Sequence, residues 1–158
     1  MSSCRTGRPT SPPPHPVAAR YGVNELNGFA SWFGDLTDKQ PEAVQDVLRE
    51  CIRGEWKFAA DREHVHGVLN DLVWHGQELI KFITPTLLDL VRQGDPKNAM
   101  ILQQALTILV RDDQSDAREL GLIARDRLIT IEPSGGTFLL WLTLMMQIDA
   151  EVGLTAYV

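Results

Sequence analysis

The sequence predicts an all-α protein made of antiparallel helix pairs. Apolar residues recur at i, i+3, i+4 and i+7 along most of the chain beyond residue 20. Proline, glycine and acidic residues divide this pattern into segments of helical length, and no apolar run reads as a strand with a partner. Two arrangements satisfy the pattern: a short α-solenoid, which the pattern favours, and a compact helical bundle.

Residues 95–112, DPKNAMILQQALTILVRD, predict the helix around which the rest of the chain packs. Asp95 suits the N-cap position, and Pro96 suits the first turn, where a proline costs no hydrogen bond. The polar residues between positions 99 and 111 are only Gln103, Gln104, Thr107 and Arg111. A helix that is apolar on nearly all sides is buried on several of them, so other helices are expected to surround it.

Two helices are expected at the start of the helical region. Apolar residues in segment 23–36 have helical spacing, with Asn24 as the expected N-cap and Gly34 as the expected end. Asp38 and Pro41 suit the start of the second helix, which carries a single apolar face. The residues of that face are Val44, Val47, Leu48, Cys51 and Ile52, and Gly54 suits its end.

Two more helices are expected before residue 95. Helical spacing returns over residues 65–73, and Gly76 is expected to stop that helix. Thr84 and Pro85 then form a second cap-and-proline pair, which suits the start of a helix that Gly94 terminates.

Three helices are expected after residue 112. Residues 113–116 supply caps for a helix whose buried side extends to residue 131, and residues 133–136 break the chain. Residues 137–148 predict the last full helix, and Asp149 suits the cap of one more. That last helix would end on apolar residues, so we expect either further helices beyond it or self-association through it.

Residues 1–20 are expected to form a disordered or extended tail. The segment contains five of the nine prolines in the chain and too few apolar groups to offset its ordering entropy. Residues 21–158 are expected to form one all-helical domain, either complete or a fragment of a longer helical repeat array.

The expected helix pairs have a regular rhythm. They begin near Pro41, Leu79 and Asp116, which are 38 and then 37 residues apart. Periods of this size belong to two-helix solenoids, although the consensus residues of TPR and ankyrin repeats are missing.

The segments LLDLVRQGDP, ILQQALTILV and WLTLMMQIDAE resemble a degenerate HEAT-like solenoid, as in the C-terminal part of large bacterial STAND-class NTPases. That resemblance implies a partner-sensing region without catalytic residues, which would be part of a larger signalling or defence protein.

Charge and cysteine content restrict the classes of partner. A net charge of −6 argues against nucleic acid, which requires a basic face. Cys4 and Cys51 do not make a disulfide framework, and the N-terminus lacks the apolar region of a secretory signal, so we expect a cytoplasmic protein. The most apolar run, FLLWLTLMM, is about half the length that spans a bilayer, so we expect no membrane partner.

No residue pattern predicts catalysis, a metal or a cofactor. On one straight helix, His64 and His66 would point about 200° apart, and His75 would lie roughly 16 Å further along the axis. The apolar neighbours of Cys51 indicate a buried, inert thiol. Walker, GxGxxG, GxSxG and HExxH motifs are absent from the sequence.

The tryptophans are the candidate partner-binding residues. Trp56 and Trp74 lie near helix ends and off the ideal apolar stripes, and Trp32 lies in the first expected helix. Partly exposed tryptophan is a common interface anchor, and packing at the edge of the core is the alternative for each.

We expect a non-catalytic protein-interaction or scaffold module. The alternative is a ligand-binding or enzymatic bundle with an internal pocket.

Overall fold

The computed structural model describes residue 29 and residues 32–57, 67–113 and 115–148. These residues form seven α-helices, one short 3-10 helix and no strand, which confirms the all-α prediction. The helices are α2 (Trp32–Lys39), α3 (Pro41–Trp56), α4 (Val68–His75), η1 (Gln77–Leu79), α5 (Ile80–Gln93), α6 (Ala99–Arg111), α7 (Ala117–Thr130) and α8 (Phe138–Ile148).

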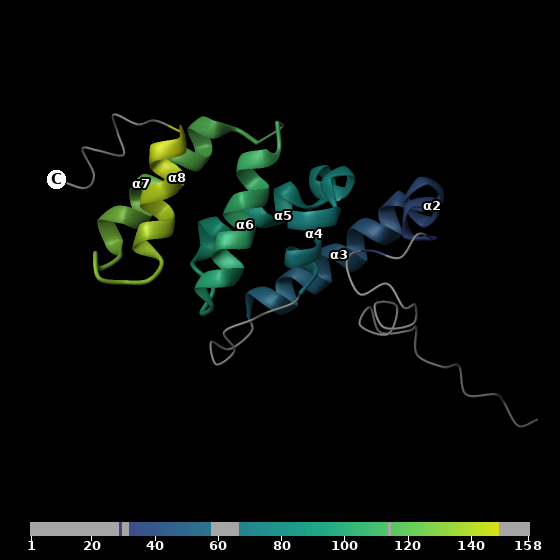
Figure 1. Cartoon of the computed structure of the whole chain (residues 1–158), viewed down its shortest axis with the longest axis horizontal. Coiled ribbons are helices and arrows are strands. Elements are labelled where there is room, and N and C mark those ends of the chain that lie inside the picture. The colour runs from purple at the N-terminus through teal and green to yellow at the C-terminus, as the bar shows by residue number, and fades with distance from the viewer. Residues whose placement is uncertain (1–28, 30–31, 58–66, 114, 149–158) are drawn as a thin grey trace, which may run out of the picture.

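The helices follow one another along the longest axis of the molecule, from α2 at one end to α7 and α8 at the other (Figure 1). Consecutive helices pack as pairs, α3 with α4, α5 with α6 and α7 with α8. The first helices of the pairs also pack on one another, because α5 contacts both α3 and α7. In the same way α6 contacts both α4 and α8, so each pair touches the next through both of its helices.

Helix α6 lies at the centre of the core, as its sequence predicts. Its side chains Ile101, Leu102, Ile108 and Leu109 are fully buried, and they join buried residues of α3, α4, α5, α7 and α8 in one connected cluster. Gln104 is buried as well, and its amide donates to Asn70 Oδ1 of α4 at 3.4 Å.

The prediction that Asp95 caps α6 is wrong. The N-cap is Asn98, whose side-chain oxygen accepts a hydrogen bond of 2.9 Å from the backbone N–H of Met100. The helix therefore begins at Ala99, beyond Pro96. The Asp95 carboxylate instead binds a tryptophan of α8, and this contact draws it away from the helix terminus.

The prediction that Thr84 and Pro85 begin a helix is also wrong. Helix α5 begins at Ile80 and continues through Pro85 to Gln93. A proline inside a helix removes one backbone hydrogen bond and crowds the preceding turn. The buried side chains on both sides of it, from Ile80 to Val91, form one continuous core-facing stripe, and their burial outweighs that cost.

Two of the glycines that were predicted to end helices lie inside them instead. Helix α2 passes through Gly34, and α3 passes through Gly54 and ends at Trp56, whose side chain packs in the core. Other signals are confirmed, because Pro41 occupies the first turn of α3 and Gly76 is the C-cap of α4.

The caps and breaks around α7 match the sequence. The Asp116 carboxylate accepts from the backbone N–H groups of Arg118 and Glu119, at 2.9 and 3.4 Å, and so caps the helix. Helix α8 begins after the turn at residues 133–136. The expected tail at 1–20 and the expected last helix at 149–158 lie outside the described residues.

Candidate protein-interaction surface

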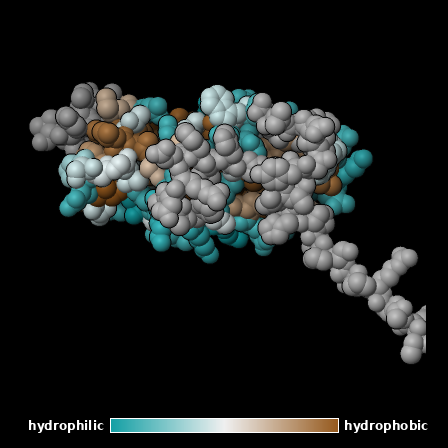
Figure 2. Space-filling view, turned by 60° about the horizontal axis from the view of Figure 1, so that its bottom comes forward, coloured by the Kyte–Doolittle hydropathy of each residue, from teal (hydrophilic) through white to brown (hydrophobic). Residues whose placement is uncertain are grey.

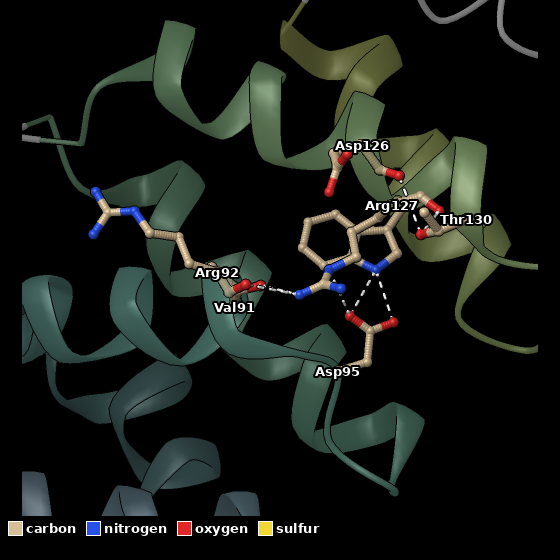
Figure 3. A network of polar contacts seen from close by, with 7 residues as sticks. Val91, Arg92, Asp95, Asp126, Arg127 and Thr130 are labelled. Atoms are coloured by element: carbon tan, nitrogen blue, oxygen red, sulfur yellow. Dashed lines mark hydrogen bonds and ion pairs between the residues drawn. The ribbon is translucent and has the colours of Figure 1, made fainter.

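A buried polar contact fixes the position of α8 against the core. The indole N–H of Trp141 donates to both carboxylate oxygens of Asp95, at 3.1 and 3.0 Å (Figure 3). Asp95 lies between α5 and α6, so this contact ties α8 to the connection that leads into the central helix. Arg127 of α7 provides the opposite charge, with its Nε 3.5 Å from the Asp95 carboxylate.

The same arginine caps the end of α5. Its Nη2 donates to the carbonyl oxygens of Val91 and Arg92, at 2.8 and 3.1 Å, as Figure 3 shows. The last carbonyl groups of a helix have no partner within it, and a guanidinium placed there also suits the helix dipole. Arg127 therefore holds α5, α7 and the Asp95 connection together.

A second arginine makes an equivalent contact between α4 and α6, the second helices of their pairs. Arg111, at the end of α6, donates from Nη1 to the carbonyl oxygen of Val73 in the last turn of α4, at 2.6 Å. Both arginines thus place a cation on the C-terminal carbonyl groups of a neighbouring helix. Arg111 therefore joins the ends of α4 and α6.

A groove of about 340 Å³ lies between α6 and α8. The residues that line it are Gln103, Leu106, Thr107, Val110, Arg111, Leu140, Thr143, Leu144 and Gln147. Leu106 and Leu144 are buried at its base, while Val110 is 44% exposed at its rim. The lining combines an apolar base with polar sides, which is the composition of sites that bind protein segments.

The polar side chains of the groove differ in what they can offer a ligand. The hydroxyls of Thr107 and Thr143 donate to carbonyl oxygens of their own helices, at 2.8 and 2.7 Å, and retain only acceptor capacity. The amides of Gln103 and Gln147 make no hydrogen bond within the described part of the chain, so each offers a donor and an acceptor. Arg111 is the only charged residue of the lining.

The three tryptophans that were candidate partner-binding residues differ in exposure and in their place in the fold. Trp74, in the last turn of α4, is 69% exposed and directly follows Val73, whose carbonyl oxygen binds Arg111. Trp32 is 41% exposed in α2, at the opposite end of the molecule, with its ring 5.8 Å from that of Phe33. Trp56 is buried in the core, which is the packing alternative stated for it.

Two further hollows are lined mainly by polar and charged side chains. The larger, about 630 Å³, lies where the start of α5 meets residues 111–113, and Lys81 and Asp112 line both of them. Asp112 accepts a hydrogen bond from the Thr84 hydroxyl of α5, and this contact explains its position. The described residues contain no group of three or more metal-binding side chains, and His64 and His66 lie outside them.

The sequence predicted no groove, but it did mark polar positions on the α6 side of it. Of the four polar positions that interrupt the apolar surface of the central helix, Gln103, Thr107 and Arg111 line the groove, and the fourth, Gln104, is buried against Asn70. The contribution of α8 was missed, because the run FLLWLTLMM reads as a core segment and its Thr143 is a single polar residue within it. The signal was the spacing of Thr143 and Gln147, which are one helical turn apart.

Comparison with protein-family models, curated proteins and solved structures gave no match. Among the described residues, no helix combines the length and the apolar content that a membrane span requires.

Proposed function

We propose that the chain is a non-catalytic helical-repeat module of the HEAT-like solenoid type, which binds a protein partner in the groove between α6 and α8. The observation that carries the proposal is a repeat in the polar contacts between helices. Four of the hydrogen bonds between successive pairs join Gln45 to Phe82, Asn70 to Gln104, Val73 to Arg111 and Val91 to Arg127. The residues in these bonds are separated by 37, 34, 38 and 36 positions.

Separations of this size are the length of one helix pair in a solenoid. In such a stack, residues at equivalent positions of neighbouring repeats lie side by side, so contacts recur at the repeat length. Two further contacts between successive pairs, Arg92 with Glu119 and Trp141 with Asp95, join residues 27 and 46 positions apart, on either side of the repeat length. The contacts of α5 with α3 and α7, and of α6 with α4 and α8, support the same arrangement of two layers.

The chemistry of the groove indicates the kind of partner. Its base accepts one or two large apolar side chains, and the amides of Gln103 and Gln147 can bind the N–H and C=O groups of a peptide backbone. A carboxylate-rich segment would be opposed by the net charge of −6 of the chain. The partner is therefore a short protein segment with large apolar side chains among uncharged polar residues, and Trp74 is a candidate anchor for it.

Selection of peptides from a random phage-displayed library against the purified chain tests the proposal. Val110→Glu places a charge at the rim of the groove, and Val47→Glu is the control, because Val47 of α3 has the same 44% exposure outside the groove. We expect enriched peptides with large apolar residues, whose affinity falls at least about tenfold with Val110→Glu and stays unchanged with Val47→Glu. Failure to enrich any peptide, or equal binding by both variants, would contradict the proposal.

The resemblance to the sensor region of STAND-class NTPases extends the proposal to a signalling or defence protein. In that setting the groove receives the protein that is sensed, and any catalytic step belongs to another module.

A further inference from the structure

Apolar side chains gather on the surface of the last helix pair. Eight large apolar side chains among the described residues are exposed, and four of them belong to α7 and α8. Figure 2 shows apolar surface at the end of the molecule that these two helices occupy. Two of the four are Leu122 and Ile129 of α7, at 62% and 75%.

The exposed face of α7 has the same pattern in both directions along the helix. Leu122, Arg125, Asp126 and Ile129 are spaced i, i+3, i+4 and i+7, which places them on one face. Read from either end, the face presents an apolar residue, two oppositely charged residues and another apolar residue. A rotation of 180° about a point between positions 125 and 126 exchanges Leu122 with Ile129 and Arg125 with Asp126.

We propose that this face of α7 docks on the same face of a second copy of the chain, with the two helices antiparallel. A two-fold contact requires a surface that is complementary to itself. Here each Arg125 opposes Asp126 of the other copy, and each Leu122 packs near Ile129 of the other copy. The contact therefore contains two ion pairs, with an apolar contact on each side of them.

The charged residues are available for this contact. Arg125 and Asp126 are exposed, and neither side chain forms an ion pair within the described part of the chain. Arg127, which follows them, points the other way and binds α5 and Asp95 (Figure 3). An unrelated partner would impose no symmetry on this face, whereas a second copy explains both the charges and their order.

Docking through α7 is independent of the proposed peptide groove. None of the four residues lines the groove between α6 and α8. A variant that alters self-association thus leaves peptide binding intact, and the two proposals can fail separately.

Sedimentation equilibrium of the full chain over a wide concentration range tests the inference by charge exchange. The wild-type chain is expected to form a reversible dimer. Arg125→Asp and Asp126→Arg each place like charges opposite one another, and each is expected to raise the dimer dissociation constant at least about tenfold. Circular dichroism confirms that the variants remain helical.

Two combinations of the charge reversals place opposite charges against one another again, and they test the antiparallel geometry. An equimolar mixture of Arg125→Asp and Asp126→Arg chains brings two acids against two arginines, so a heterodimer forms with affinity near that of the wild type. The double variant Arg125→Asp/Asp126→Arg restores the homodimer for the same reason. Leu122→Glu weakens every one of these dimers.

Three results would overturn the inference. The first is a wild-type chain that stays monomeric at the highest concentration. The second is a wild-type dimer that neither single charge reversal weakens, which would place the contact elsewhere. The third is weakening by both single variants without restoration in the mixture or the double variant.

Discussion

Trp141 and Asp95 are 46 positions apart in the sequence, yet the indole N–H of Trp141 lies within 3.1 Å of both oxygens of the Asp95 carboxylate. The Trp141 side chain is fully buried, so its N–H requires a partner inside the protein. The carboxylate is in turn only partly exposed and lies beside Arg127. This contact joins the third helix pair to the second, and we expect it to stabilise that junction.

Asp95→Ala is expected to lower the free energy of unfolding by about 1–3 kcal/mol, because it leaves the buried Trp141 N–H without its acceptor and removes the carboxylate that pairs with Arg127. Urea denaturation followed by circular dichroism measures the loss. Asp89→Ala is the control, because Asp89 pairs with Arg92 on an exposed surface, where such pairs contribute little. A double-mutant cycle with Trp141→Phe isolates the contact, and additive effects would contradict the coupling.

Arg127→Met is expected to destabilise the fold by about 1–3 kcal/mol, since the carbonyl groups at the end of α5 and the Asp95 carboxylate both lose their charged partner. Arg118→Met, on the exposed part of the same helix, is expected to change stability by less than about 0.5 kcal/mol. Thermal unfolding compares the two variants. Equal melting temperatures would show that the Arg127 contacts contribute nothing.

Leu109→Ala is expected to cost about 2–5 kcal/mol, because Leu109 is fully buried in the centre of the core. The adjacent Val110→Ala is the control, since Val110 is 44% exposed. Guanidinium denaturation gives both midpoints. A similar midpoint for the two variants would mean that α6 is not the central helix of the core.

Asn98→Ala is expected to cost about 0.5–2 kcal/mol through loss of the α6 cap, while Asn98→Asp retains an acceptor and costs less. Stability measurements on both variants test the assignment of this residue as the N-cap. If alanine and aspartate destabilise the protein equally, the side-chain cap has no role in stability.

The sequence predicted the elements of the fold better than their boundaries. Periodic apolar residues identify α3 through α8, because burial of one helix face imposes that period wherever the helix lies. The starts at Asp95 and Thr84 failed for a different reason. Cap and proline signals are local, whereas Asp95 is held by Trp141 and Pro85 is retained within α5 by its buried neighbours.

The candidate surface required information that no local pattern contains. Gln103 and Thr107 were visible as polar breaks in an apolar helix, but the partner helix of their groove depends on how α8 packs against α6. Trp56 and Trp74 have similar positions near helix ends, yet one is 9% and the other 69% exposed. Exposure at such positions is decided by neighbouring elements, so the sequence could name both but could not separate them.

The most direct test of the proposed function is a ¹⁵N–¹H NMR titration of the chain with a peptide selected from the random library. Binding in the groove predicts the largest shifts at Gln103, Thr107, Val110, Thr143 and Gln147, with small shifts in α2 and α3. The Val110→Glu chain is expected to show these shifts only at much higher peptide concentration. Shifts concentrated outside α6 and α8, or no shifts at saturating peptide, would contradict the proposal that this groove binds a protein partner.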